Sequence, residues 1–170
     1  DKNIIHRDLL ATKALVYNPC EFKCSPPIAE TESTEYGAYA FNLNGFSTRF
    51  RVAKITPTKI GQFVTLWKRS AKGPIQPYDV SDAIDFFIIS VRNVNYFGQF
   101  VFPKSILCEK NIFSTNAKGG KRGIRVYPPW DKTTSKQAKK TQEWQIKYFL
   151  EISKDHSIDC ARVKLLYSRN

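Results

Sequence analysis

The segment from Asp85 to Arg92, DFFIISVR, constrains the fold more than any other part of this 170-residue chain. Between its charged ends, every side chain except Ser90 is apolar, without the alternation that marks a strand with one face in water. A short run of this kind, rich in phenylalanine and isoleucine, is typical of a strand that is covered on both faces. We therefore expect a sheet with this strand at its centre.

A β-hairpin is expected before the central strand. Aromatic residues alternate at Tyr39 and Phe41, Asn44-Gly45 supplies a two-residue turn, and residues 46–55 form the returning strand. Proline then interrupts the pattern, because it has no amide to donate to a neighbouring strand. Further strands are expected at residues 62–69, 96–102 and 123–127.

Helices are expected towards both ends of the chain. Residues 3–16 place apolar side chains on one face of a helix. A second helix is expected over residues 135–153, where Thr134 followed by Gln137 forms a capping-box pattern. A third, shorter helix is expected over residues 159–167.

The order of these elements predicts the fold class. We expect an α+β fold: a mostly antiparallel sheet of five to six strands, with the N-terminal helix and the C-terminal helices packed on it. The length of the chain fits one domain over residues 1–170.

Positive charge is concentrated in two segments. The chain has 27 Lys and Arg against 15 Asp and Glu, a formal net charge of +12 at pH 7. Residues 48–69 hold six basic residues and no acid, and residues 114–140 hold eight with Asp131 as the single acid. Such clustering indicates a binding face for an anionic partner. The acidic stretch of residues 30–35 is a candidate to fold onto this face and mask it.

Nucleic acid is the partner that we expect, bound mostly through its phosphates and with weak sequence preference. Alternation along a strand places Arg49 and Arg51 on one face of the sheet and Lys54 on the other, so loops must supply part of the surface. The predicted phosphate contacts are Arg49, Arg51, Lys54, Lys59, Lys68, Arg69, Lys118, Lys121, Arg122 and Arg125.

Aromatic side chains near the basic segments are candidates for stacking on bases. Trp67 and Trp130 are the first candidates, and Tyr96 and Tyr127 are further ones. Packing in the core is the competing explanation for each ring. The stretch KGGKRG, residues 118–123, lacks the spacing of a nucleotide-hydrolase P-loop, and we expect a flexible loop that contacts phosphates.

The four cysteines form no dense framework. Cys20 and Cys24 are near zinc-ligand spacing, but Cys108 and Cys160 stand alone, so we expect no metal site and no cofactor. Reduced thiols and a cytoplasmic protein are expected, with a Cys20–Cys24 disulfide only under oxidation. No apolar run approaches the ~20 residues of a membrane span, so no membrane partner is expected.

No complete catalytic motif is present. The expected fold is similar in architecture to restriction-endonuclease-like nucleases, which use an acid on one strand and an acid-x-Lys on the next. The expected strand reads Val-Ala-Lys at residues 52–54 and lacks the acid, which leaves Glu35, Asp85 and Lys54 as candidates for an unorthodox site. A metal-dependent nuclease and an interaction module for an acidic protein are therefore the alternatives to nucleic-acid binding without chemistry.

Several stretches together resemble the MepB family. They are YGAY from Tyr36, RVAKITPTKIGQFVTLWKR from Arg51, the pair IDFFIISV and FGQFVFPKSIL, then KGGKRGIRVYPPWD and TQEWQIKYFLEIS. The resemblance covers about residues 36–153, whereas the N-terminal helix and the loop that bears Cys20 and Cys24 carry little of it. It implies a small cytoplasmic bacterial protein, and it implies no particular activity.

Overall fold

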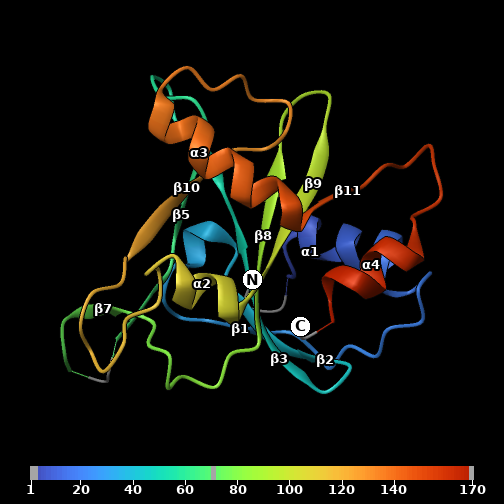
Figure 1. The fold of residues 1–170 in the computed structure, drawn as a ribbon. Helices are drawn as coiled ribbons and strands as arrows, with labels where there is room; N and C mark the ends of the chain where they lie inside the picture. Colours follow the sequence, from blue (N-terminus) through green and yellow to red (C-terminus); the bar gives the residue numbers. More distant parts are fainter. Residues whose placement is uncertain (1–3, 70–71, 169–170) are drawn as a thin grey trace.

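A six-stranded sheet lies at the centre of the protein (Figure 1). The computed structural model describes residues 4–69 and 72–168. Neighbouring strands are antiparallel except β3 and β8, which run parallel, so the predicted α+β class with a mostly antiparallel sheet is confirmed. In spatial order the strands are β1 (Ile28–Ala29), β2 (Tyr39–Leu43), β3 (Phe46–Val52), β8 (Phe86–Arg92), β9 (Phe97–Pro103) and β11 (Phe149–Glu151).

The predicted hairpin joins β2 and β3. Leu43 pairs with Phe46, and Asn44 and Gly45 between them both have positive φ, at 52° and 88°. Positive φ at both turn residues is the type I′ geometry that the Asn-Gly pair favours. The hairpin prediction is therefore confirmed.

β8 is the covered central strand that its apolar run predicts. Phe86 and Ile88 pack into the core on one face, while Phe87, Ile89 and Val91 pack into the core on the other. All five side chains are fully buried. Burial of each contributes roughly 1.5–3 kcal/mol. Because parallel strands need a long crossover, the chain between β3 and β8 has room for further strands, which belong to two smaller sheets.

The smaller sheets interrupt two strands that the sequence predicts as continuous. One has the order β10 (Gly123–Val126), β5 (Gln62–Thr65) and β4 (Lys54–Ile55), and the other pairs β6 (Trp67–Arg69) with β7 (Ile75–Pro77). The expected strand of residues 46–55 changes sheet after Val52, and that of residues 62–69 changes at Leu66. Leu66 donates its amide to the carbonyl of Arg122 at 2.9 Å and buries its side chain, which divides the second strand.

The two ends of the chain cover the face of the main sheet that carries Phe86 and Ile88 (Figure 1). α1 (Arg7–Thr12) continues as a π-helical segment, η1 (Lys13–Tyr17), and α4 (Cys160–Leu166) packs in the same core. A hydrogen bond also joins the two ends, because the hydroxyl oxygens of Tyr17 and Tyr167 lie 2.8 Å apart. The predicted terminal helices are confirmed, but the first begins at Arg7 rather than at residue 3, which lies outside the described residues.

A disulfide joins these two ends. Cys20, which follows η1, is bonded to Cys160, the first residue of α4, across 140 residues of sequence. Cys24 and Cys108 are free thiols. The expectation of reduced thiols throughout is therefore wrong, as is the Cys20–Cys24 pairing. Sequence spacing could not indicate this bond, because the packing of α4 against η1 brings the two sulfurs together.

The opposite face of the main sheet carries the smaller sheets, α2 (Lys104–Glu109) and α3 (Lys136–Gln145). α3 begins near the predicted residue, but its N-cap is Ser135, whose Oγ accepts the Ala138 amide at 3.0 Å, rather than Thr134. No helix within the described residues is long and apolar enough to cross a membrane.

The predicted helix over residues 135–153 is wrong in its second half. After Gln145 the chain makes a 3-10 turn, η3 (Ile146–Tyr148), and then enters β11. Phe149 pairs with Phe100 of β9, and Glu151 pairs with Gly98. Pairing with the exposed edge of β9 satisfies backbone groups of both strands, which outweighs the helical pattern of the local sequence.

Candidate functional site

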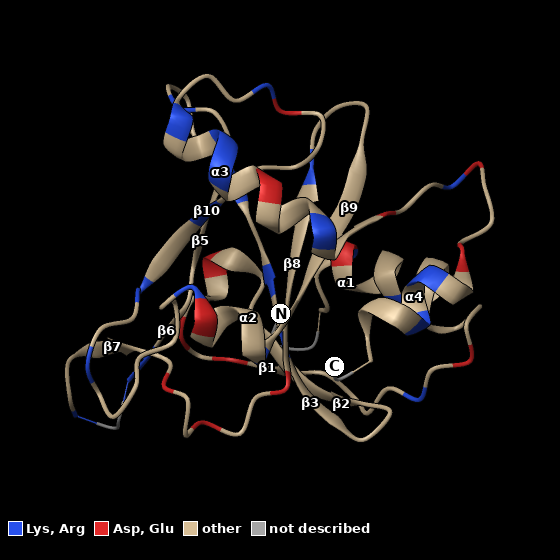
Figure 2. Cartoon of the chain, viewed as in Figure 1, with Lys and Arg blue, Asp and Glu red and all other residues tan. Residues whose placement is uncertain are grey.

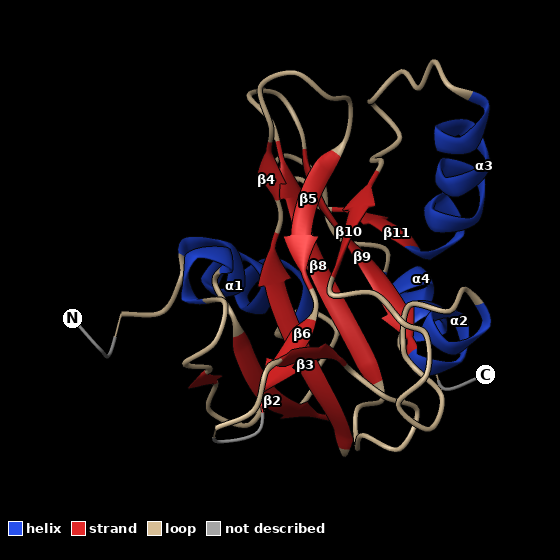
Figure 3. Cartoon of the chain, turned by 90° about the vertical axis from the view of Figure 1, so that its left-hand side faces the viewer, coloured by secondary structure: helices blue, strands red, loops and turns tan. Residues whose placement is uncertain are grey.

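A groove of about 620 Å³ lies between α3 and the small sheet of β10 and β5. Figure 3 shows α3 beside β10 at the end of the molecule that carries this sheet. Because β10 pairs with β5, residues of the two basic segments share the groove. The lining residues are Lys59, Phe63, Lys110, Ile112, Lys121, Gly123, Ile124, Arg125, Tyr127, Ser135, Gln137, Ala138, Thr141, Trp144 and Gln145.

The groove is cationic. Lys59, Lys110, Lys121 and Arg125 line it, and none of its described lining residues is an aspartate or glutamate. The N-terminal half of α3 adds further exposed positive charge beside it, from Lys136, Lys139 and Lys140 (Figure 2). Like charges gathered on a concave surface produce a positive potential that attracts anions.

Arg125 braces the loop that carries Lys59. Its guanidinium donates to Thr56 Oγ1 at 2.8 Å and to the carbonyl oxygens of Ile60 and Gly61 at 3.4 Å. These contacts hold the loop between β4 and β5 at the rim of the groove. Arg125 therefore has a structural task in addition to its charge.

Two glutamines of α3 attach the helix to the rest of the groove. Gln145, which is buried, accepts the Tyr127 amide at 2.8 Å and donates to the Arg125 carbonyl at 3.0 Å. Its carboxamide thus binds the edge of β10 in the way that another strand would. One turn earlier, Gln142 donates to the carbonyls of Pro128 and Asp131, both at 2.9 Å. The separation of the two walls is fixed by these bonds.

The segment that leads into the glycine-rich loop of residues 118–123 is held by hydrogen bonds. Thr115 and Lys118 exchange backbone hydrogen bonds of 2.9 and 3.0 Å. The Asp79 carboxylate accepts from the Ala117 amide at 3.0 Å and from Ser114 Oγ at 2.8 Å. Hydrogen bonds from Ala117, Ser81 and Ser114 hold the pKa of Asp79 well below its usual range. These bonds hold residues 114–118 in a turn in which Lys118 is exposed, and the flexibility of the residues that follow stays a prediction.

Arg49 and Arg51 lie on the sheet face expected for them, but Glu30 covers them. Arg51 is fully buried, and its Nη1 donates to Glu30 Oε1 at 2.7 Å. Nη1 of Arg49 lies 3.4 Å from Glu30 Oε2, and the Tyr78 hydroxyl completes the cluster at 3.4 Å from the same oxygen. Burial raises the pKa of Tyr78. In this conformation Arg51 is closed to a ligand, so its prediction as a phosphate contact is wrong.

The remaining predicted cations are divided between other surfaces. Lys68 pairs with Asp82 at 2.7 Å, and Arg69 lies over the ring of Trp67 at 5.6 Å, around a separate hollow of about 280 Å³. Lys54 lies over the Tyr36 ring at 4.6 Å. Lys118 and Arg122 are exposed without lining the groove. Of the ten predicted contacts, the groove brings together Lys59, Lys121 and Arg125.

The aromatic residues that were predicted to stack on bases also lie at different sites in the structure. Trp130 is already stacked on Tyr96, with ring centroids 5.2 Å apart and planes 13° apart, and it meets Phe149 edge-on. Trp67 lines the separate hollow beside Arg69. Tyr127 lines the groove.

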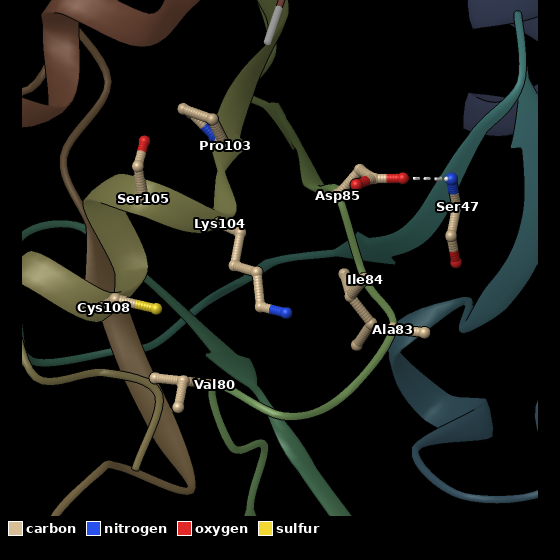
Figure 4. Close-up of a pocket in the computed structure, with 9 residues that line it drawn as sticks. All are labelled: Ser47, Val80, Ala83, Ile84, Asp85, Pro103, Lys104, Ser105 and Cys108. Atoms are coloured by element: carbon tan, nitrogen blue, oxygen red, sulfur yellow. Dashed lines mark hydrogen bonds between the residues drawn. The ribbon is translucent and has the colours of Figure 1, made fainter. Parts of the chain in front are cut away.

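The three candidate catalytic residues do not converge. Asp85 immediately precedes β8 and lies beside the start of β3, where its Oδ2 accepts the Ser47 amide at 2.8 Å (Figure 4). Lys54 follows the far end of β3, whose seven residues span roughly 23 Å. Glu35, in the 3-10 turn η2 (Thr34–Tyr36), precedes the tyrosine on which Lys54 lies. The structure thus places Glu35 towards Lys54 and leaves Asp85 at the other end of the strand.

Asp85 instead lines a pocket of about 650 Å³ beside α2 (Figure 4). Lys104 and Cys108 share this pocket, and the Lys104 ammonium donates to the Asp82 carbonyl at 2.6 Å. Burial raises the pKa of the Cys108 thiol, against the opposing effect of Lys104, so the thiol stays protonated at neutral pH. Across residues 4–69 and 72–168, no three His, Cys, Asp or Glu side chains form a group able to hold a metal ion.

Sequence reasoning missed Lys110 and the contribution of α3 to the groove. Ala138, Thr141 and Trp144 form one face of the predicted helix, and this face is the one that turns to the groove. The small and polar residues on it were the available signal, because a face that packs fully against a core carries larger apolar side chains. No sequence pattern marked Lys110 as a binding residue, since it lies outside both basic segments.

Comparison with known proteins places this fold in a family. The family model described as MepB-like matches residues 30–151. A solved structure, the crystal structure of MepB, is 35% identical with a TM-score of 0.74, over 86% of this chain and 97% of that chain. A bacterial homing endonuclease is 13% identical with a TM-score of 0.46, over 84% of this chain and 90% of that chain. No curated protein matches. The chain belongs to the MepB-like family.

Proposed function

We propose that this protein binds nucleic acid in the groove between α3 and β10, mostly through phosphate contacts. The observation that supports the proposal is the lining itself: four cations and, among the described lining residues, no carboxylate. Elsewhere on the surface, Arg49 is paired with Glu30 and Lys68 with Asp82. In the groove, Lys110 lies 3.9 Å from the Glu109 carboxylate, but Lys59 and Lys121 are exposed and form no ion pair with the described residues. These two lysines are therefore available to an anion.

The polar residues of the groove suit a polyanion. Ser135, the N-cap of α3, and Gln137 and Thr141 of the helix add hydroxyl and carboxamide donors to the lining of the groove. Hydroxyl, amide and ammonium donors are the groups that most often contact phosphate and sugar, and such contacts carry no sequence information. Weak sequence preference and strong salt dependence follow. A cytoplasmic location remains a prediction of the sequence.

Salt titration tests the proposal. Affinity is measured by fluorescence anisotropy with labelled single- and double-stranded DNA and RNA at 50 and 200 mM salt. If all four cations contact phosphates, the affinity should fall roughly 50-fold for a single strand and roughly 150-fold for a DNA duplex over this range. An absence of binding at 50 mM salt would refute the proposal.

A pair of matched variants locates the site. Lys59→Gln with Lys121→Gln removes two groove charges, and Lys23→Gln with Lys154→Gln removes two exposed charges elsewhere. Both double variants have the same net charge. The groove variant should lose affinity and show a salt slope smaller by about 1.4–1.8, whereas the control should retain the slope of the unmodified protein. Equal losses in the two variants would place binding outside the groove.

A further inference from the structure

The disulfide between the two ends of the chain lies beside a pocket of about 460 Å³. One wall of the pocket is the loop that joins β11 to α4, drawn in orange-red in Figure 1. The lining consists of Leu15, Pro19, residues 153–158 and Cys160. Cys160 is half-buried, whereas Cys20 is only 5% exposed and is not among the described residues of the lining. The pocket therefore gives access to the bond from the side of Cys160.

The two free thiols of the protein are poor nucleophiles for this bond. Cys24 packs against the core cluster that contains Cys20, and Cys108 packs on the other face of the main sheet. Burial raises the pKa of the Cys24 thiol, against the opposing effect of Lys13, so the thiol stays protonated at neutral pH. Only a thiolate attacks a disulfide sulfur. Exchange at the disulfide therefore requires a thiol from outside, and the pocket offers it a route to Cys160.

α4 is also held by contacts that do not depend on the disulfide. Nη2 of Arg162 donates to the carbonyls of Lys147 and Phe149, both at 3.1 Å, which ties the helix to β11. At the other end of the helix, the Tyr167 hydroxyl donates to Gln99 Oε1 of β9 at 2.6 Å. These contacts keep α4 docked when the disulfide opens, so the two sulfurs stay close enough to form the bond again.

We propose that Cys160 is a thiol–disulfide exchange site of the folded protein, and that its substrate is a low-molecular-weight thiol that enters the pocket beside it. The incoming thiolate bonds to the Cys160 sulfur while the bond to Cys20 breaks, and the Cys20 thiolate takes a proton from water. A second small thiolate attacks the small-thiol sulfur of this mixed disulfide, and Cys160 leaves as a thiolate. Two electrons thus pass from two small thiols, which become one small disulfide, to the protein. The reverse sequence restores the Cys20–Cys160 bond.

The exchange site is separate from the groove. Both cysteines lie outside residues 30–151, the range that the MepB-like model matches, so the site belongs to the two ends of this chain. They pack in the core on one face of the main sheet, whereas Ile112 and Ile124 of the groove pack on the other. The pocket volume of about 460 Å³ falls within the ~300–1,000 Å³ typical of small-molecule sites, which suits a thiol of tripeptide size.

The urea dependence of reduction distinguishes attack on the folded protein from attack after unfolding. The unmodified protein is mixed with reduced glutathione at several urea concentrations below the unfolding midpoint. The reaction is quenched with acid, and free thiols are counted by alkylation and mass spectrometry. A rate limited by unfolding should rise roughly 30-fold per M urea, whereas attack through the pocket should change by less than about twofold per M. A rise of the first kind would refute the proposal, as would an absence of reduction without urea.

Two matched variants identify the sulfur that is attacked. In a Cys24→Ser, Cys108→Ser background, Cys20→Ser leaves Cys160 as the single thiol, and Cys160→Ser leaves Cys20, so both variants lack the disulfide. With oxidised glutathione, the rate of mixed-disulfide formation at Cys160 should change by less than about twofold per M urea, and that at Cys20 should rise roughly 30-fold per M.

The comparison of these variants tests the assignment to Cys160. Mass spectrometry of the intact variants measures both rates. Equal rates without urea, or a faster reaction at Cys20, would overturn the assignment. The experiment on the unmodified protein needs no substitution and decides the question if a variant does not fold.

Discussion

Replacement of Glu30 by glutamine should destabilise the protein by about 3 kcal/mol, although Glu30 lies near the surface. Its carboxylate is the acidic partner of Arg51, whose side chain is fully buried, and it also faces Arg49. Removal of one partner of a buried ion pair typically costs ~3–5 kcal/mol, because the other charge remains in the interior without compensation. The lower end applies here, since the Glu30 side chain keeps 14% exposure and a glutamine oxygen still accepts a hydrogen bond.

Urea unfolding followed by tryptophan fluorescence measures this effect. With a slope of about 2 kcal/mol per M, a loss of about 3 kcal/mol should move the midpoint down by roughly 1.5 M urea. Glu35→Gln is the control: Glu35 is exposed, and substitutions at such sites usually change stability by less than ~0.5 kcal/mol. All samples keep the Cys20–Cys160 disulfide, so that only the charge differs.

A second substitution tests the reason for the loss. Arg51→Met removes the buried charge, so the double variant Glu30→Gln, Arg51→Met should be more stable than Glu30→Gln alone. The reasoning is refuted if Glu30→Gln lies within about 0.5 kcal/mol of the unmodified protein. It is also refuted if the double variant is no more stable than the single one, because the cost would then come from packing and not from an unpaired guanidinium.

Two further predictions concern the ties that hold the ends and the basic loop. Reduction of the Cys20–Cys160 bond should lower the free energy of unfolding by about 2–5 kcal/mol, because it releases a loop of 140 residues in the unfolded chain; an unchanged unfolding midpoint in the presence of reductant would contradict this. Asp79→Asn should destabilise the protein at pH 6, and the difference from the unmodified protein should shrink as the pH falls below about 4. The sign follows from the lowered pKa of Asp79, whose stabilisation is present above the pKa of the unfolded state and is lost as the pH falls towards that of the folded state. A difference that stays constant from pH 6 to pH 3 would show that the ionised carboxylate is not the cause.

Local patterns were sufficient for elements whose structure depends on neighbouring residues. Asn44-Gly45 predicts the hairpin because both residues tolerate positive φ, and the observed angles agree. The unalternating run of β8 predicts burial on both faces, and both faces are covered. The prediction of a helix over residues 146–153 was wrong because Phe149 and Leu150 fit a helical face as well as a strand. Pairing with the edge of β9 decides in favour of the strand.

The candidate site was predicted in part. Charge density selected Lys59, Lys121 and Arg125, which line one groove because β10 pairs with β5, and their role as phosphate contacts stays a prediction. The same criterion selected Arg51 and Lys68, which look no different in the sequence. In the structure Arg51 forms an ion pair with Glu30, and Lys68 forms one with Asp82. Glu30 lies 21 residues from Arg51, and no local pattern reports such a pairing.

The sequence by itself determined the α+β class, the central strand and the two segments in which positive charge gathers, because hydrophobic period, turn residues and charge density are properties of short stretches. Only the tertiary structure decided which cations remain available, how α3 and β10 form a groove, and which cysteines are bonded. The physical reason is that burial, ion pairing and bond formation depend on partners far away in the chain. For Arg51 that partner is Glu30, for the groove it is the pairing of β10 with β5, and for Cys20 it is Cys160.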